Sequence, residues 1–350
     1  MKQKLPIGIL GCGAISQIAH IPAALRAQNV QLAALCDRDE LLLHRVADKA
    51  NVAARYNDYH QMLASPEIAA VVLAIPDSLH VPLAIQALRA GKHVLVEKPL
   101  GSASDQCHEL VHLVESSNLK LQVGCMKRHD LGIRFAREHV KSKLGKILSF
   151  SAVFQDTVFR SAMQATCLDP LVASGRQNPS DDDWKADRCH YNLFTQGAHL
   201  FDMLLYLTGP ITSVHAIQAE LHGNFSWHGI LTSAAGAAGH FELTCKTSGD
   251  WCERYHVAGE GGNVEIDVGL WFYHRPAKVR AFAGDQQTWT QPLTGYSNMF
   301  ANQLDSFAEC IELDRPTTPN VRDGLAVVEI LEAIETSIRL GQQVEVGKGG

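Results

Sequence analysis

The sequence predicts an α/β protein with a doubly wound parallel sheet in its N-terminal part and a second domain of a different kind. Three observations lead to this prediction. A glycine-rich turn follows the first apolar run and opens a helical segment at Ala14. Short apolar runs then alternate with segments of helical period as far as residue 123. Beyond that point, several segments alternate polar and apolar residues, as strands with one solvent-facing side do.

Length and composition restrict the class of protein. With 350 residues the chain is longer than one typical core, and we expect two domains, residues 1–124 and 125–350. The content of 46% hydrophobic and 19% charged residues is that of a soluble globular protein. A net charge of −6 argues against nucleic acid or an anionic membrane surface as a partner. No apolar run approaches the roughly 18 residues needed to span a bilayer.

Cysteine and histidine usage bears on compartment and metals. The nine cysteines are dispersed without a Cys-x-x-Cys pair, which favours reduced thiols in a cytoplasmic protein. The seventeen histidines are interpreted mostly as surface or packing residues. We therefore expect no metal site.

The turn after the first strand has the spacing of a dinucleotide-binding motif. The segment Ile7–Ser16 reads IGILGCGAIS. Gly11 would let the chain reverse tightly, and Gly13 would let backbone approach a pyrophosphate. The helix that opens at Ala14 and Ile15 would offer free N–H groups and a partial positive charge to that anion.

The helical segment after the turn carries two irregular features. Ser16 replaces the third glycine of the pattern, so a hydroxymethyl must fit close to the strand. Ile18, Ile21 and Leu25 recur on one helical face. Because Pro22 lies within the segment, we expect a kink or a break there.

An acidic residue ends the second predicted strand. The strand covers Gln31–Cys36, and Asp37 follows about 20 residues after the glycine turn, where a carboxylate would accept both hydroxyls of an adenosine ribose. Its charge would favour NAD over NADP. Arg38 could instead hold a 2′-phosphate, so NADP stays open, and Asp37 could also be an ordinary loop acid.

The remaining elements of the first part continue the alternation. The prediction covers a helix over Leu41–Ala50, a segment over Tyr59–Ala64, a buried strand over Ala69–Ile75, a helix to Ala90 capped by Asp77 or Ser78 and closed by Gly91, a strand over His93–Val96, a helix over Ala103–Ser117 and a strand over Leu121–Val123. Ligands of doubly wound sheets bind beyond the carboxyl ends of the strands. The glycine turn, Asp37, Pro76 and Lys98 all lie at such ends.

The second part is predicted to combine strands with a terminal helix. Alternating segments cover His240–Cys245, Val264–Val268 and Val279–Phe282, Gly261-Gly262 suits a hairpin, and Leu325–Leu340 has helical period. The segment Ala173–Arg188 is predicted to be a long loop near the site, with a helix-capping turn at Asp181-Asp182-Asp183.

Several of these motifs together identify a family resemblance. Four N-terminal features resemble segments of the glucose–fructose oxidoreductase / inositol dehydrogenase (Gfo/Idh/MocA) family: IGILGCGAIS, Asp37, Ile75–His80 and Glu97-Lys98-Pro99. Four later features resemble the same family: Met126-Lys127-Arg128, the Gly-x-His-x-x-Asp sequence of Gly197–Asp202, Ala258–Ile266 and the C-terminal helix. The resemblance covers nearly the whole chain. It implies an N-terminal Rossmann domain and a C-terminal α/β domain with a large, mainly antiparallel sheet.

The resemblance also implies roles for individual residues. Lys98 would contact the substrate, Glu97 would lie near the nicotinamide ribose, and Ile75, Pro76 and His80 would border the cofactor. A secondary alcohol that loses a hydride must also lose its hydroxyl proton, so the site needs a base and a group that steadies the developing alkoxide. Lys98 is our candidate for the second role. His199 is our candidate acid/base, and Asp202, at i+3 on a helix, could orient its ring.

Two departures from the family pattern leave the substrate open. Thr195 stands where family members often carry an aspartate; its hydroxyl can bond a substrate but cannot take its proton at neutral pH. His190 and Tyr191 replace a usual Gly-Gly and would either line a more polar pocket or merely pack. Arg128 is a further candidate for substrate contact.

The leading functional hypothesis is an NAD(P)-dependent dehydrogenase that acts on a cyclic polyol, an inositol or a sugar. One alternative is a glycoside hydrolase of the same architecture that oxidises its substrate transiently and regenerates NAD. Another is a non-catalytic dinucleotide-sensing regulator. We also expect a homodimer or homotetramer that associates through the C-terminal sheet, because large open sheets often bury a face against another subunit.

Overall fold

The computed structural model describes residues 3–174 and 187–347, which form two compact units. The first unit contains residues 3–126, 168–174 and 300–325. The second contains residues 127–167, 187–299 and 326–347. We expected a single boundary, between residues 124 and 125. The chain instead returns to the first unit twice, so each unit is assembled from segments that are distant in sequence.

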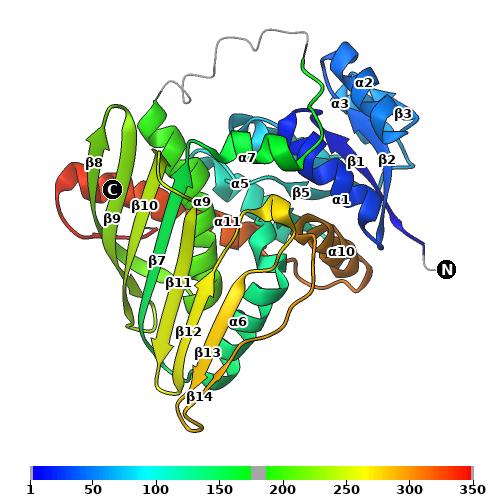
Figure 1. The fold of residues 1–350 in the computed structure, drawn as a ribbon. Coiled ribbons are helices and arrows are strands. Elements are labelled where there is room, and N and C mark those ends of the chain that lie inside the picture. The colour runs from blue at the N-terminus through cyan, green and yellow to red at the C-terminus, as the bar shows by residue number, and fades with distance from the viewer. Residues whose placement is uncertain (1–2, 175–186, 348–350) are drawn as a thin grey trace. The chain divides into compact units, whose positions relative to one another are not determined.

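The first unit is built on a six-stranded parallel sheet (Figure 1). Its strands are β1 (Leu5–Leu10), β2 (Val30–Cys36), β3 (Ala54–Tyr56), β4 (Ala70–Leu73), β5 (His93–Val96) and β6 (Leu121–Val123). Their order, β3-β2-β1-β4-β5-β6, is that of a Rossmann sheet. The expected doubly wound parallel sheet is thus confirmed, and the central strand β4 is buried throughout, as its continuous apolar run predicts.

The helices of this unit follow the predicted alternation. They are α1 (Ile21–Arg26), α2 (Glu40–Ala50), α3 (Tyr59–Ala64), α4 (His80–Arg89), α5 (Ser104–Glu115) and α10 (Met299–Glu312). Gly91 follows α4 with φ of +77°, as the predicted C-terminal cap requires. The predicted N-terminal cap is wrong: Asp77–Leu79 forms a 3₁₀ turn, and α4 begins after Leu79 without a side-chain cap.

The expected break near Pro22 takes the form of a π-helical turn. Ser16–His20 winds with the wider π period, and Ile21 N–H bonds the carbonyl of Ser16 before α1 begins. This extra residue shifts the helical phase. His20 therefore points into the interior, whereas Leu25, which the regular pattern placed on the buried face, is 59% exposed.

The second unit is built on a nine-stranded mixed sheet within the described residues (Figure 1). Its strands are β7 (Ile147–Thr157), β8 (Ile211–Leu221), β9 (Asn224–Ser233), β10 (Ala238–Thr247), β11 (Cys252–Gly259), β12 (Gly262–Asp267), β13 (Lys278–Ala283), β14 (Thr288–Thr290) and β15 (Val344–Glu345). Their order is β14-β13-β12-β11-β7-β10-β9-β8-β15. Every neighbouring pair is antiparallel except β7 and β10, which confirms a mainly antiparallel sheet.

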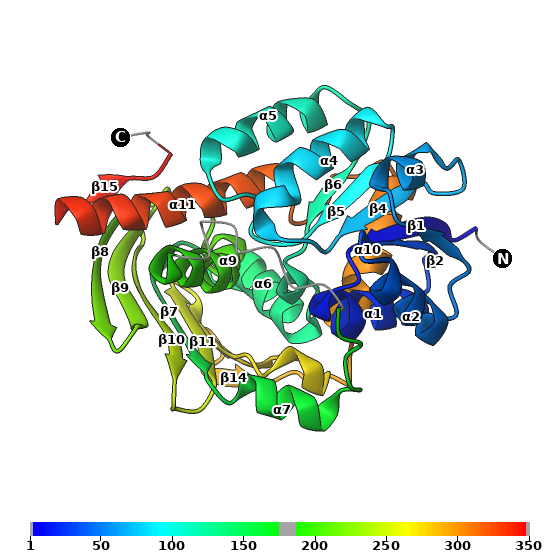
Figure 2. The same cartoon turned by 90° about the horizontal axis from the view of Figure 1, so that it is seen from above.

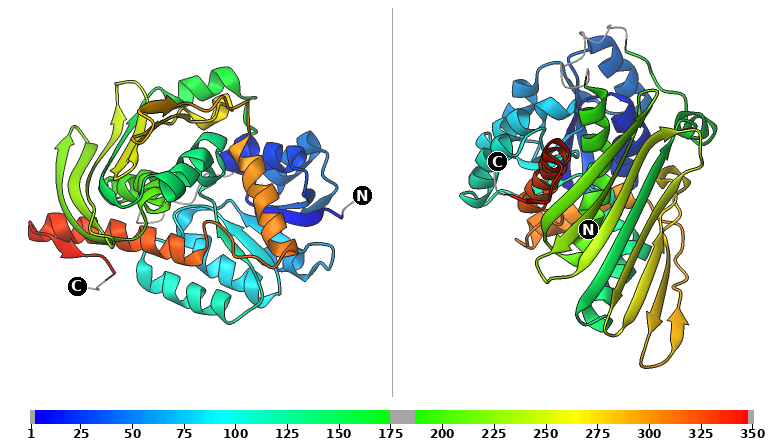
Figure 3. Two further views of the ribbon diagram at one scale, coloured as in Figure 1. Left: turned by 90° about the horizontal axis from the view of Figure 1, so that it is seen from below. Right: turned by 90° about the vertical axis from the view of Figure 1, so that its left-hand side faces the viewer.

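One face of this sheet is covered by helices. They are α6 (Leu131–Lys143) and α9 (Arg188–Thr208). The second-unit part of α11 (Val321–Leu340) packs on α9 through Leu331 and accepts the N–H of Ala216 in β8 through Ser337. The helix α7 (Arg160–Cys167) contacts the 3₁₀ turn Trp271–Tyr273. Figure 2 shows α6 and α9 along that face. Burial alternates along β7, with Phe150, Ala152 and Phe154 inward, because successive side chains of a strand point to opposite faces. The opposite face is turned to the viewer in the right-hand view of Figure 3.

Two smaller predictions concern loops. The hairpin at Gly261-Gly262 is confirmed, since β11 and β12 pair from Gly259 opposite Gly262. Most of the predicted loop Ala173–Arg188, including Asp181-Asp182-Asp183, lies outside the described residues. At its end, Asp187 caps α9 by accepting the N–H of His190.

Candidate active site and cofactor site

The glycine turn of the first unit has the geometry that a dinucleotide needs. Gly11 has φ of +96°, and a Cβ there would come within 2.3 Å of the carbonyl oxygen of Ala74, so no other residue fits. Gly13 is different, because a Cβ built on it meets no atom within 4 Å. Glycine is therefore not required at residue 13 by the protein itself, and the open space is where a pyrophosphate would approach the backbone.

Asp37 fastens this turn to the end of β2. One carboxylate oxygen accepts the N–H of Cys12 at 2.7 Å, and the other accepts the N–H of Asp39 at 2.8 Å. Because a carboxylate has about four lone-pair sites, capacity remains for ribose hydroxyls. Asp39, which sequence reasoning missed, caps α2 by accepting the N–H of Leu42. The side chain of Arg38 is exposed.

These residues fit a bound dinucleotide. Gly13, Ala14 and Pro76 are exposed at the carboxyl edge of the sheet, and Ile15 and Ile75 are partly exposed. The side-chain hydroxyl of Ser16, by contrast, is buried and has no hydrogen-bond partner among the described residues. A backbone cradle, an acidic residue beside it and an accessible strand edge are the parts that Rossmann sheets use.

His80 lies between the loops that follow β4 and β5. The sequence places it at the border of the cofactor, and in the structure the ring is fully buried. Its Nδ1 lies 2.7 Å from the carbonyl oxygen of Pro99, and its Nε2 lies 3.1 Å from that of Ile75. The imidazole therefore ties the loop after β4 to the loop after β5. It belongs to the framework of the site rather than to its surface.

The loop after β5 carries Glu97 and Lys98. Glu97 is buried, and its carboxylate faces the ring of His20 with Oε1 and Nε2 2.8 Å apart. Its Oε2 accepts the N–H of Lys98 at 3.1 Å. Burial by itself would raise the pKa of Glu97, but the bond from His20 and the charges of His20, Lys98 and His80 hold it below its ordinary value. Lys98 is partly exposed, as expected of a residue that meets a substrate.

A segment from later in the chain lies beside the glycine turn in the first unit. The side-chain amide of Gln17 donates from Nε2 to the backbone carbonyls of Cys12 and Val172, and its Oε1 accepts the N–H of Val172 at 2.8 Å. Ser174 donates to the carboxylate of Asp39. Nothing in the local sequence of this segment predicts these bonds, because its partners are more than a hundred residues away.

In the second unit, two buried ion pairs join the turn before α6 to α9 and β11. Arg128 and Asp202 are almost fully buried and approach to 2.8 Å, and Lys127 donates to both carboxylate oxygens of Glu253 at 2.6 and 2.7 Å. Arg128 is thus neutralised inside the protein, and we no longer assign it to the substrate. The pairing of Asp202 with Arg128 was not predicted from the sequence.

Five candidate residues lie along α9: His190, Tyr191, Thr195, His199 and Asp202. His199 is partly exposed, and its ring stacks over that of Phe154 with centroids 6.4 Å apart. Thr195 is buried and donates its hydroxyl hydrogen to the carbonyl of Tyr191 at 2.7 Å, so it can only accept from another group. The role of Asp202 in orienting His199 stays a prediction.

The side chain of His190 contacts two residues of the second unit, Glu335 and Phe194. Its Nδ1 lies 2.7 Å from a carboxylate oxygen of Glu335, and its ring stacks on Phe194 with centroids 4.1 Å apart. Of the two interpretations of His190, packing is therefore favoured over substrate contact. Tyr191 is partly exposed one residue later.

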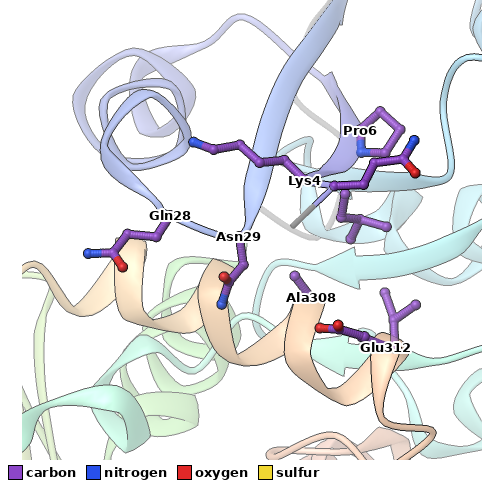
Figure 4. Close-up of a pocket in the computed structure, with 9 residues that line it drawn as sticks. Lys4, Pro6, Gln28, Asn29, Ala308 and Glu312 are labelled. Atoms are coloured by element: carbon purple, nitrogen blue, oxygen red, sulfur yellow. The ribbon is translucent and has the colours of Figure 1, made fainter. Parts of the chain in front are cut away.

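Other features of the chain do not join this site. A surface pocket of about 360 Å³ lies at the amino end of β1, beside α10, and Figure 4 shows Lys4, Asn29 and Glu312 among its lining residues. The carboxyl end of β1, with the glycine turn, is the opposite end of the strand.

The segment His108–His112 of α5 reads His-Glu-Leu-Val-His, a spacing that sequence reasoning overlooked and that can pair two imidazoles on one helical face. Both histidines are exposed, and Glu109 pairs with Arg89. Within residues 3–174 and 187–347, no group of three or more His, Cys, Asp or Glu side chains is arranged to hold a metal ion. No described helix has the length and apolar character needed to cross a bilayer.

Comparisons with known proteins agree with this architecture. Residues 5–125 match the model of the Gfo/Idh/MocA oxidoreductase family with its NAD-binding Rossmann fold, and residues 133–265 match the model of the family's C-terminal domain. A D-xylose 1-dehydrogenase (NADP⁺) of Haloferax volcanii is 24% identical over 97% of this chain and 99% of its own. An inositol 2-dehydrogenase of Rhizobium meliloti is 25% identical over 97% of this chain and 98% of its own.

Solved structures show the same fold. A levoglucosan dehydrogenase in complex with NADH superposes with a TM-score of 0.83 at 20% identity, over 99% of this chain and 100% of that one. The glycine turn, the acid after β2 and the Glu-Lys-Pro loop thus lie in a domain that a family of NAD-binding proteins shares. The chain belongs to the Gfo/Idh/MocA family of oxidoreductases, with an NAD-binding Rossmann domain at its N-terminus.

Proposed function

We propose that this protein is an NAD(P)-dependent dehydrogenase that transfers a hydride between a secondary alcohol of a cyclic polyol, inositol or sugar and nicotinamide. The observation that carries the proposal is a continuous chain of contacts along one sheet edge. Asp37 bonds the glycine turn, the turn packs on Ala74, and His80 links Ile75 to Pro99 next to Lys98. The names of the related sugar and inositol dehydrogenases support the substrate class.

The coenzyme would be held by residues of this edge. Gly11, Gly13, Ala14 and Ile15 would face the pyrophosphate, and Asp37 would accept the ribose hydroxyls. When bound, nicotinamide supplies the acceptor or donor of the hydride. Asp37 favours NAD, and the exposed Arg38 leaves NADP as a second coenzyme.

The chain's own residues would move the proton and steady the charge. Lys98 would donate to the substrate oxygen as negative charge develops on it, because an ammonium stabilises an alkoxide. His199 would take the hydroxyl proton, since imidazole titrates near neutral pH. Thr195 could act only as a hydrogen-bond acceptor, because its hydroxyl already donates a hydrogen bond to the backbone carbonyl of Tyr191.

The test is a substrate survey. Purified protein is mixed with inositols, aldoses, anhydrosugars and deoxy or amino sugars, each with NAD and with NADP, and nicotinamide absorbance is followed. Steady reduction with at least one compound is expected. Cleavage of an aryl glycoside without net reduction, or tight coenzyme binding without turnover on any compound, would contradict the proposal.

We further propose a cytoplasmic homo-oligomer. None of the nine cysteines, which all lie in the described part of the chain, is joined in a disulfide, and this supports a reducing compartment. The face of the nine-stranded sheet that no described helix covers carries Ile217 and Ile230, which are 65% and 62% exposed. They lie on neighbouring strands, and a second copy of the same face would bury them.

A further inference from the structure

Two buried imidazole rings contact the loop that carries Lys98, one on each side of that residue. His20 meets the carboxylate of Glu97 just before Lys98, and His80 meets the carbonyl of Pro99 just after it. Both rings have no exposed surface. Of these two histidines, the sequence interpretation noticed only His80.

We infer that His20 is a positioning residue of the reaction: through the carboxylate of Glu97 it fixes the backbone at Lys98 and so holds the ammonium group where the substrate oxygen must lie. The inference rests on the proposed function. It adds a residue of the π-helical turn to the site, although that residue touches neither the coenzyme nor the substrate.

The contacts form one path. The Nε2 of His20 is 2.8 Å from Oε1 of Glu97, and Oε2 of the same carboxylate accepts the N–H of Lys98 at 3.1 Å. A carboxylate held at both oxygens cannot rotate without breaking one of these bonds. Its position therefore sets the direction of the Lys98 backbone.

Packing restricts the positions of the His20 ring and the Glu97 carboxylate. The ring of His20 packs edge-on against Phe300 with centroids 5.4 Å apart, and its Nδ1 has no hydrogen-bond partner among the described residues. On the other side, a Cβ on Gly124 would lie 3.0 Å from both Cα and Oε1 of Glu97. The space for the carboxylate thus depends on a glycine after β6.

The π-helical turn explains how His20 reaches this position. A regular α-helix from residue 14 would give residue 20 a different direction, because each extra residue per turn rotates the following side chains by about 100°. The π-helical turn directs His20 inward, and π-helical turns occur often at functional sites.

The contact between His20 and Glu97 should affect how the enzyme's activity depends on pH. The ionisable groups that face Glu97 are His20, Lys98 and His80, and with them its pKa is below the ordinary value. Without His20 the carboxyl would still be buried, but it would lose its largest stabilising contact. Its pKa would then rise, and the protonated acid would loosen the loop at a higher pH.

The experiment compares three single variants. His20→Leu removes the donor, His20→Gln keeps an amide N–H near the place of Nε2, and His93→Gln is the control. His93 lies at the opposite end of the same strand β5, where its ring accepts the N–H of Lys120. Steady-state kinetics and coenzyme dissociation constants are measured for each over a range of pH.

We expect His20→Leu to lower kcat about ten- to a hundred-fold, with a coenzyme dissociation constant within about threefold of the parent. The acid limb of its kcat profile should move to higher pH. His20→Gln should recover most of kcat, and His93→Gln should resemble the parent. Equal loss in His20→Leu and His20→Gln, or a fall in kcat with no movement of the acid limb, would overturn the inference.

A second measurement does not depend on turnover. Because the pKa of Glu97 is depressed in the folded state, its contribution to stability is present above the unfolded value of 4.5 and is lost as pH falls. In His20→Leu this loss should begin at a higher pH, and in His20→Leu/Glu97→Gln it should disappear. Glu97→Gln alone completes the cycle. Additive stability changes in the two single variants and the double variant would refute the pairing even if no substrate were found, whereas coupling without any dehydrogenase activity would count against the proposed function alone.

Discussion

At the scale of single residues, burial and partners divide the candidates into those that can meet a ligand and those that hold the site in place. Lys98, His199 and Asp37 keep partial exposure at the ends of their strands or on α9. His80, Arg128 and Asp202 are buried within their own units, and their polar atoms face protein groups. A sequence motif contains both kinds, because a family needs the support as much as the reacting group.

Lys98→Ala should leave coenzyme binding nearly unchanged while turnover falls by roughly three orders of magnitude, because the ammonium acts on charge that develops only in the transition state. Coenzyme titration by fluorescence and steady-state kinetics check this. A rate within tenfold of the parent would remove Lys98 from the mechanism.

Asp37→Ala should lower the binding affinity for NAD by about ten- to a hundred-fold and that for NADP by less, since only NAD offers both ribose hydroxyls to the carboxylate. Both coenzymes should lose some affinity, because Asp37 also holds the N–H of Cys12. Titration with each coenzyme gives the ratio. Equal losses would show that Asp37 supports the turn without recognising the ribose.

At the scale of elements, local rules placed the strands and most of the helices, and they failed where a turn depends on what lies against it. The strand His93–Val96 and the strand Leu121–Val123 match their predictions residue for residue, because buried parallel strands are short apolar runs between breakers. The segment from Ser16 to Leu25 did not follow its regular period, since Pro22 lacks the N–H that an α-helix needs there.

The two glycines of the turn should respond differently to alanine. Gly13→Ala should fold with a melting temperature close to that of the parent but bind coenzyme far more weakly, because its Cβ fills open space. Gly11→Ala should be destabilised by several kcal/mol, because its Cβ would collide with Ala74 at a positive φ. Thermal unfolding and coenzyme titration separate these outcomes, and equal melting temperatures would refute the assignment.

Glu253→Gln should destabilise the protein by about 3–5 kcal/mol, because the buried ammonium of Lys127 would lose the charged carboxylate that accepts two of its hydrogen bonds. Lys127→Met/Glu253→Gln should recover part of that loss, since the amide can still accept from Tyr255 and the buried ammonium is removed together with the carboxylate. Chemical denaturation of both variants measures the difference. A double variant less stable than the single one would contradict this explanation.

At the scale of the whole molecule, each compact unit is assembled from separate stretches of the chain. Residues 168–174 and 300–325 belong with the Rossmann sheet although other elements precede them. Bonds such as that between Asn29 N–H and the carboxylate of Asp305 join these stretches, and no local pattern signals them. The prediction of two continuous domains therefore missed these returns of the chain.

Ile230→Glu should convert the proposed oligomer to smaller species, because a carboxylate on the uncovered sheet face would be buried without a partner. Sedimentation velocity of the parent and the variant gives the mass. Leu41→Glu is the control, since Leu41 is 49% exposed on α2 of the other unit. A parent that sediments as a monomer, or a variant with unchanged mass, would refute association through this face.

By itself the sequence determined the fold class, the cofactor edge and the family, because strand and helix periods and the chemistry of a glycine turn are local properties. Tertiary structure alone decided which polar residues are available. The contact of His20 with Glu97, the pairing of Arg128 with Asp202 and the contact of His80 with Pro99 all join residues that are well separated in the chain. The cost of burying a charge or an imidazole depends on such distant partners, and a linear pattern does not contain them.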